Sequence, residues 1–129
     1  MIGYTMLGVK DIQKSAAFYD QVLGLMGASR KMDHEKFILW NNAADQPSFS
    51  ICLPYDGDTP TVGNGSMIAF PVEKIEDVHK VYECAIKNGA TDEGAPGYRY
   101  GGYYIAYFRD PDGNKLAAYI YENENKKHL

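Results

Sequence analysis

The chain has 129 residues, a net charge of -4 and two cysteines, Cys52 and Cys84. A chain of this length can bury enough apolar surface to fold without disulfide bonds or a structural metal ion. It shows no charged-then-apolar leader and no apolar run near the ~20 residues that a membrane span requires. Lys126 and Lys127 form its one basic cluster, which argues against binding to a phosphate backbone. We therefore expect a cytoplasmic protein that acts on neither membranes nor nucleic acids.

The chain begins with a pattern that returns later in the sequence. A short apolar strand is expected over Gly3 to Val9, and an amphipathic helix with a period of 3.6 residues follows it. A second strand, Met67 to Val72, precedes a second helix at an offset of 63 residues, which aligns Tyr19 with Tyr82. The chain therefore contains two copies of one module.

The apolar period changes from 3.6 towards 2 after each helix, which predicts three strands in each copy. The expected strands cover residues 28–32, 36–41 and 48–53 in the first copy and 91–92, 103–109 and 115–121 in the second. The fold class is therefore α+β, with two tandem βαβββ modules. We place module 1 over residues 1–54, a linker rich in Pro, Gly and Asp over 55–65, and module 2 over 66–125.

Local signals mark the ends of these elements. Asp11 is a candidate N-cap of the first helix, and Asn88 with Gly89 is a candidate stop for the second. The segment Asp110–Gly113 has Pro at the second turn position and Gly at the fourth, which predicts a tight turn into the last strand.

Three segments together resemble the vicinal oxygen chelate superfamily, which includes glyoxalase I, the bleomycin-resistance proteins and the extradiol dioxygenases. They are Val9-Lys10-Asp11, Phe18-Tyr19 leading to Leu23-Gly24, and the run from Phe108 to Leu116, FRDPDGNKL. The resemblance implies paired modules whose curved mixed sheets surround a cleft, usually completed by a second subunit. We therefore expect a homodimer; whether the modules pair within one chain or between subunits stays open.

The resemblance also implies where metal ligands would lie, because metal-dependent members carry them on the first and last strands of each module. The corresponding residues here are Tyr4, Met67, Ala117 and one of Ser50, Ile51 or Cys52. A transition metal normally needs at least three N, O or S ligands at about 2 Å. Met67 and Ala117 do not serve, and Tyr4 and Cys52 are poor substitutes. We therefore expect no metal ion and no other cofactor.

Tyrosine is concentrated near the end of the chain, where seven of the eleven lie between Tyr98 and Tyr121. Strand alternation places Tyr103 with Tyr107 on one face, and Ala117 with Tyr119 on one face of the last strand. Such rings could hold an aromatic or cationic ligand, and the negative net charge agrees with a cation. The alternative is that they pack against helices or at a subunit interface.

The remaining candidate functional residues can also be explained without a functional role. The Gly-rich segment 92–102 could be a lid whose Arg99 recognises an anion, or a plain mobile hairpin with a solvated arginine. Phe37 and Trp40 could form a cleft wall, although a lone tryptophan is more often core. His34, His79 and His128 have no ligand spacing, and the two cysteines have no activating partner nearby in sequence.

Together these observations predict a metal-free cleft that binds a small organic molecule, as in the bleomycin-resistance type. The expected lining residues are Tyr4, Trp40, Ser50, Cys52, Met67, Arg99, Tyr107, Ala117 and Tyr119. The alternative is a metal-dependent enzyme of the same superfamily, above all a lyase like lactoylglutathione lyase, which takes the hemithioacetal of methylglyoxal and glutathione.

Overall fold

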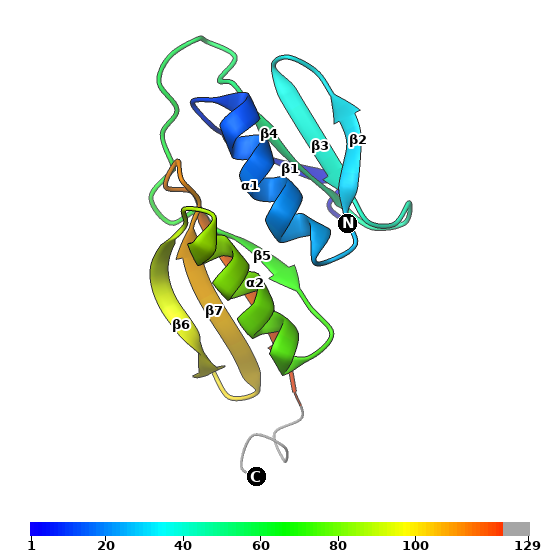
Figure 1. The fold of residues 1–129 in the computed structure, drawn as a ribbon, viewed down its shortest axis with the longest axis vertical. Helices are drawn as coiled ribbons and strands as arrows, with labels where there is room; N and C mark the ends of the chain where they lie inside the picture. Colours follow the sequence, from blue (N-terminus) through cyan, green and yellow to red (C-terminus); the bar gives the residue numbers. More distant parts are fainter. Residues whose placement is uncertain (123–129) are drawn as a thin grey trace. The chain divides into compact units, whose positions relative to one another are not determined.

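The computed structural model of the chain describes residues 1–122. The chain forms two compact units, one over Met1–Asn64 and one that begins at Gly65. Each unit contains one helix and one four-stranded mixed sheet (Figure 1). The predicted α+β class and the duplicated βαβββ order are confirmed.

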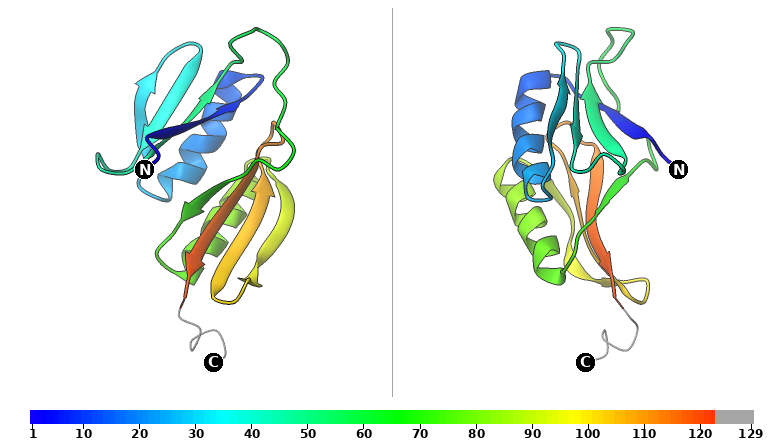
Figure 2. Two further views of the ribbon diagram at one scale, coloured as in Figure 1. Left: turned by 180° about the vertical axis from the view of Figure 1, so that it is seen from behind. Right: turned by 90° about the vertical axis from the view of Figure 1, so that its right-hand side faces the viewer.

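The first unit has its strands in the order β1-β4-β3-β2. Strand β1 pairs in parallel with β4, and the other neighbours pair antiparallel. Helix α1 lies against one face of this sheet (Figures 1 and 2). The elements are β1 (Tyr4–Gly8), α1 (Ile12–Gly24), β2 (Ser29–Asp33), β3 (Phe37–Asn41) and β4 (Ser48–Cys52).

Helix α1 begins where the sequence predicts, because the Asp11 side chain accepts a hydrogen bond from the Lys14 N–H at 3.1 Å. Its buried stripe packs on the sheet through aromatic rings. The Tyr19 ring centroid lies 5.8 Å from that of Trp40 and 4.8 Å from that of Phe49. All three side chains are buried, so they form the core between helix and sheet.

The second unit repeats this topology with the order β5-β8-β7-β6 and a parallel β5–β8 pair. Helix α2 covers one face of the sheet (Figures 1 and 2). The elements are β5 (Ile68–Pro71), α2 (Ile75–Lys87), β6 (Thr91–Arg99), β7 (Tyr103–Arg109) and β8 (Lys115–Tyr121).

The predicted helix stop and turn in this unit are confirmed. Helix α2 ends at Lys87 with Asn88 as C-cap, and Gly89 follows with a φ of 105°, a conformation that glycine adopts without a Cβ penalty. In the turn before β8, the Gly113 N–H donates to the Asp110 carbonyl at 2.8 Å. The Asp110 carboxylate accepts from the backbone N–H of Asn114 at 2.9 Å, which fixes the entry into β8.

Strand β6 is the main departure from the expected elements. The sequence indicated a strand over 91–92 and then a loop, whereas β6 continues to Arg99 and leaves only a short turn before Tyr103. Gly94 and Pro96 suggested a loop, but β6 is an edge strand with irregular register, where both residues are tolerated. Most of the 92–102 segment is therefore an edge strand paired with β7, where the sequence had indicated a loop.

Two further observations concern the chain as a whole. Among residues 1–122, no helix has the length and apolar character needed to cross a bilayer. Cys52 and Cys84 are both free thiols.

Candidate functional site

Strand register identifies the residue of the first unit that corresponds to Ala117. Ala117 pairs with Ala69 across the parallel β5–β8 ladder, and Ser50 pairs with Met6 across β1–β4. Met6 and Ala69 are related by the 63-residue repeat offset. Of the three candidates that the sequence left open, Ser50 is therefore the equivalent residue.

The two candidate positions of the first unit offer a weak set of metal donors. Tyr4 is 63% exposed and has a phenol as its only donor. Ser50 is fully buried, and its hydroxyl donates to the Thr5 carbonyl at 2.6 Å. The Ser50 oxygen is thus already engaged in joining β4 to β1.

The corresponding positions of the second unit offer even fewer donor atoms for a metal ion. Met67 carries a thioether and is 45% exposed, while Ala117 is 1% exposed and has no side-chain donor. Across residues 1–122, no group of three or more His, Cys, Asp or Glu side chains comes together. The residues at these positions do not fit the divalent ion that metal-dependent relatives of this fold would hold there.

The tyrosine-rich face of the second sheet is the side opposite α2, which we call the tyrosine face. Tyr104 marks the other side, because its hydroxyl lies 2.7 Å from His79 Nε2 of α2. The β7–β8 register then places on the tyrosine face the side chains of Tyr103, Ile105, Tyr107 and Arg109 and those of Lys115, Ala117, Tyr119 and Tyr121. The face alternation predicted from the sequence is confirmed.

Three tyrosine rings form a cluster at one end of this face. The Tyr103 ring lies 4.9 Å from Tyr121 and 6.0 Å from Tyr119, measured between centroids. Tyr103 and Tyr121 are exposed and Tyr119 is half-buried, so the cluster offers ring surface and hydroxyls to a ligand.

Tyr107 lies next to two cations. The Arg99 Cζ atom is 5.2 Å from the centre of the Tyr107 ring, and the Lys115 Nζ atom is 5.1 Å from it. Both distances lie within the range of a cation–π interaction.

Arg99 is held in place by main-chain carbonyls. Its Nη2 donates to the Ala95 carbonyl at 2.7 Å, and its Nη1 donates to the carbonyls of Gly97 and Ile105. These acceptors lie on β6 and β7, so the guanidinium joins the two strands. Arg99 is therefore not the solvated side chain that a mobile hairpin would carry.

Gly94 makes room for this arrangement. A Cβ at Gly94 would lie 3.0 Å from Tyr107 Cδ2 and 3.1 Å from Arg99 Nη2, closer than ordinary van der Waals contact. The absence of a side chain at this position lets the guanidinium and the ring lie against β6.

The first sheet has an equivalent face opposite α1, with a different chemistry. One row across its strands consists of Met6, Ser50, Leu39 and Met32. Cys52 lies on the same face, two residues after Ser50, and burial raises the pKa of its thiol. This face combines sulfur-containing and aliphatic side chains with the rings of Tyr4 and Phe37, and its β1, β3 and β4 residues carry none of the charge found on the tyrosine face.

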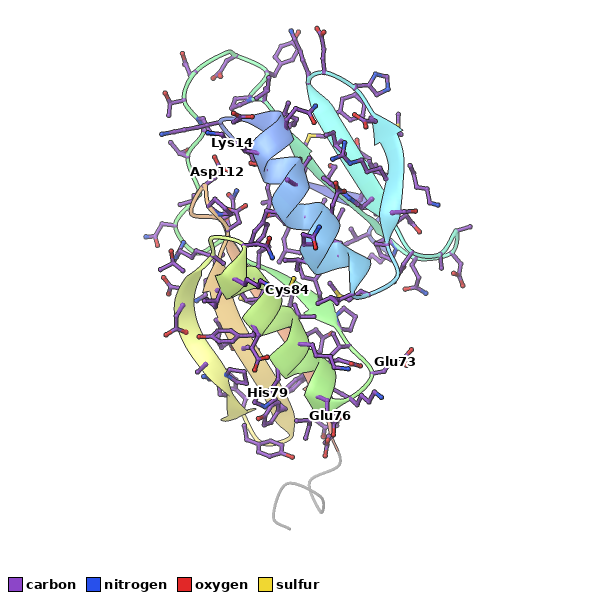
Figure 3. All side chains as sticks on the ribbon, in the orientation of Figure 1. Lys14, Glu73, Glu76, His79, Cys84 and Asp112 are labelled. Carbon is purple, nitrogen blue, oxygen red and sulfur yellow. The ribbon has the colours of Figure 1, made fainter. Side chains whose placement is uncertain are left out.

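Several candidate residues lie elsewhere. Trp40 departs from the expected cleft lining: it is 1% exposed in the core beneath α1, and its Nε1 donates to Asp20 at 2.9 Å. His34 stacks on Phe37 at the β2–β3 turn. His79 and Cys84 project from α2 (Figure 3), and His128 lies outside the described residues.

Two residues that matter on the tyrosine face were not singled out from the sequence. Lys115 begins the last expected strand and belongs to the segment that resembles the superfamily, but it was not among the expected lining residues, although its position two residues before Ala117 places it on the same face. Nothing in the sequence indicates the importance of Gly94, because it depends on the side chains of Tyr107 and Arg99, which lie against Gly94 only in the folded chain.

Comparison with known proteins gives matches along most of the chain. The family model described as Glyoxalase/Bleomycin resistance protein/Dioxygenase superfamily matches residues 1–118. A probable lactoylglutathione lyase of Synechocystis sp. is 29% identical over 121 residues, covering 88% of this chain and 89% of that protein. A lactoylglutathione lyase of Haemophilus influenzae is 28% identical over 129 residues, covering 96% and 93%.

Solved structures share the same topology. A glyoxalase/bleomycin resistance protein from Albidiferax ferrireducens T118 superposes with a TM-score of 0.86 at 34% identity, covering 95% of this chain and 99% of that one. A lactoylglutathione lyase from Agrobacterium tumefaciens has a TM-score of 0.69 at 18% identity, covering 93% and 92%. The second likeness shows the fold alone.

Proposed function

The chain belongs to the glyoxalase/bleomycin resistance protein/dioxygenase superfamily, and from this premise we propose that it binds a small organic molecule without a metal ion held by its own side chains. One observation carries the proposal: Ala117, at the last-strand ligand position, has no donor atom, and its equivalent Ser50 uses its hydroxyl on the Thr5 carbonyl. Membership of a fold family alone does not assign a function, so the function must be argued from the side chains at the site.

The tyrosine face supports this proposal through its ring surface and its polar groups. Tyr103, Tyr107 and Tyr119 offer flat apolar area and hydroxyls, the combination with which proteins hold and orient small aromatic molecules. In the first unit, Tyr4 and Cys52 mark the equivalent face, which we propose as a second, more aliphatic contact surface. We also propose Met67, the residue immediately before β5, as a ligand-contacting residue.

A thermal-shift screen of small aromatic compounds in excess EDTA tests the proposal. We expect at least one compound to raise the melting temperature of the wild-type protein, and Tyr119→Leu to reduce that increase. Tyr55→Leu is the matched control, because Tyr55 is fully exposed outside both sheets. Stabilisation that appears only after a divalent metal is added would contradict the proposal, as would a screen without any stabilising compound.

The relatives named lactoylglutathione lyase favour a second candidate, a lyase of that type. Its test is turnover of the hemithioacetal of methylglyoxal and glutathione, with Zn or Ni added in excess of the protein. Turnover that depends on the metal would favour the lyase over metal-free binding. Absence of turnover under both metals would remove this substrate.

We also propose that the protein is a cytoplasmic homodimer. The superfamily membership supports the assembly, and the two free cysteines agree with a reducing compartment. Light scattering after gel filtration measures the assembly, and a monomer mass at micromolar concentration would count against it.

A further inference from the structure

The local charge of the tyrosine face is opposite to the net charge of the chain. Three cations lie on or border this face, Arg99, Arg109 and Lys115, against one nearby carboxylate, Glu93. Glu93 is paired with Arg109 at 2.6 Å. Within the described part of the chain, Arg99 and Lys115 have no acidic partner at salt-bridge distance.

Resting on the small-molecule function proposed above, we infer that the tyrosine face takes a small aromatic carboxylate, with the anion held at Arg99 and Lys115 beside the Tyr107 ring. Both cations lie about the same distance from that ring, 5.2 Å for Arg99 Cζ and 5.1 Å for Lys115 Nζ. Two positive groups near one ring make the local potential of this face positive, which favours an anion there.

Arg99 is the fixed part of this site. Its three backbone acceptors are neutral carbonyls, so they orient the guanidinium without neutralising it. A guanidinium has five N–H donors, and Nε has no acceptor among residues 1–122. An arginine that is already ordered loses less conformational entropy when it binds an anion.

Lys115 is the adaptable part. Lys115 is half-buried, and its ammonium group is a point charge on a flexible stem, 5.1 Å from the centre of the Tyr107 ring. It can therefore follow carboxylates on rings of different size. An ordered arginine beside a flexible lysine favours a charged, planar ligand over a neutral one.

The repeat provides an internal comparison. In the second unit, Tyr107 lies between Ala117 and Gly94 in a cross-strand row. The equivalent row of the first unit holds Ser50 and Leu39, with Met32 beyond them and no cation. Lys115 lies two residues before Ala117, and its equivalent in the first unit is Ser48, two residues before Ser50. The Lys115 charge is therefore a feature of the second unit and does not follow from the shared topology.

Calorimetric titration in EDTA with three probes of one shape, 2-naphthoate, 2-naphthamide and 2-naphthyltrimethylammonium, tests the inference. We expect the carboxylate to bind about tenfold more tightly than the amide, since a hydrogen bond to a charged group exceeds one between neutral groups. Lys115→Met keeps an unbranched side chain of similar length without the charge and should remove most of this preference. Lys80→Met, on the exposed surface of α2, is the control for loss of a positive charge.

The outcomes separate the inference from the function on which it rests. Binding of the amide or the ammonium probe as tightly as the carboxylate would overturn the inference and leave small-molecule binding in place. An unchanged carboxylate preference in Lys115→Met would also overturn it. If none of the three probes binds, the inference fails, and the aromatic screen in EDTA separately decides the proposed function.

Discussion

Ser50 and Ala117 occupy the same position in the two repeated sheets: each lies on the last strand and pairs in parallel with a first-strand residue, Met6 or Ala69, at the same point of the repeat. Both are almost completely buried, at 0% and 1% exposure. One hydroxyl and one methyl group therefore stand at two equivalent positions of this fold. The metal-free proposal depends on this relationship.

Ser50→Ala should reduce the free energy of unfolding by about 1 kcal/mol, the usual net contribution of a buried hydrogen bond. The substitution removes the donor to the Thr5 carbonyl, which lies 2.6 Å from Ser50 Oγ, and weakens the link between β4 and β1. Urea denaturation measures the change. Ser29→Ala, at an exposed position of β2, is the control and should have little effect. Equal stability of both variants would show that the Ser50 bond does not support the sheet.

Gly94→Ala should destabilise the second unit by about 1–3 kcal/mol, because the added methyl group meets both Tyr107 and Arg99. Gly97→Ala, on the same strand, is the matched control: its Cβ would lie no closer than 4.0 Å to the Ala95 carbonyl oxygen or to Arg99 Nη1. Thermal unfolding compares the two variants. A Gly97 variant that loses as much stability as the Gly94 variant would contradict the packing described for the guanidinium.

Asp20→Asn should lower stability at neutral pH and have less effect in acid. The hydrogen bonds from Arg30 hold the pKa of Asp20 below its ordinary value; burial opposes this shift, and the Trp40 N–H adds to it. Because the folded pKa is the lower one, the stabilisation is present above the ordinary value and is lost as the pH falls through the folded pKa.

The expected loss for Asp20→Asn is about 0.5–1 kcal/mol at pH 7, because the ion pair with Arg30 is partly exposed and screened by solvent. Urea denaturation between pH 3 and pH 7 follows the difference from the wild type. Asp45→Asn, in an exposed turn, is the control. A difference that grows as the pH falls would have the opposite sign from the one that the Arg30 contact requires.

Cys52 should react slowly with iodoacetamide. Burial raises the pKa of its thiol, so the thiolate fraction at pH 7 is smaller than that of an ordinary cysteine. The rate is measured in a Cys84→Ser variant by mass spectrometry and compared with that of a free cysteine peptide. A rate above that of the peptide would indicate an activated thiol and would favour a catalytic function for the first unit.

The sequence predicted the duplicated fold because the repeat, the helical stripe and the turn residues are local signals. The local signals had the predicted effects: Asp11 caps α1, Gly89 follows the end of α2, and Asp110–Gly113 forms a turn. Strand β6 was missed because Gly94 and Pro96 disfavour strands locally, while pairing with β7 stabilises the strand through contacts distant in sequence.

The candidate site could be predicted in part. Alternation along β7 and β8 correctly placed Tyr107 and Tyr119 on one face, because a strand has a fixed period of two. The choice of Ser50 over Ile51 or Cys52 required the β1–β4 register, and the carbonyl partners of Arg99 required the fold of β6. The negative net charge favoured a cationic ligand. A net charge does not show where the charges lie, so it gave no sign of the cations on the tyrosine face.

Metal content per chain tests the central claim most directly. The purified protein is incubated with Zn, Ni, Mn and Fe(II) in turn, desalted, and measured by mass spectrometry for metal and protein. With Ala117 and Met67 at two of the four positions and the Ser50 hydroxyl engaged, we predict far less than one ion per chain for every metal. Retention near one ion per chain that decreases in Tyr4→Phe would contradict the account and make the metal-dependent lyase the better proposal.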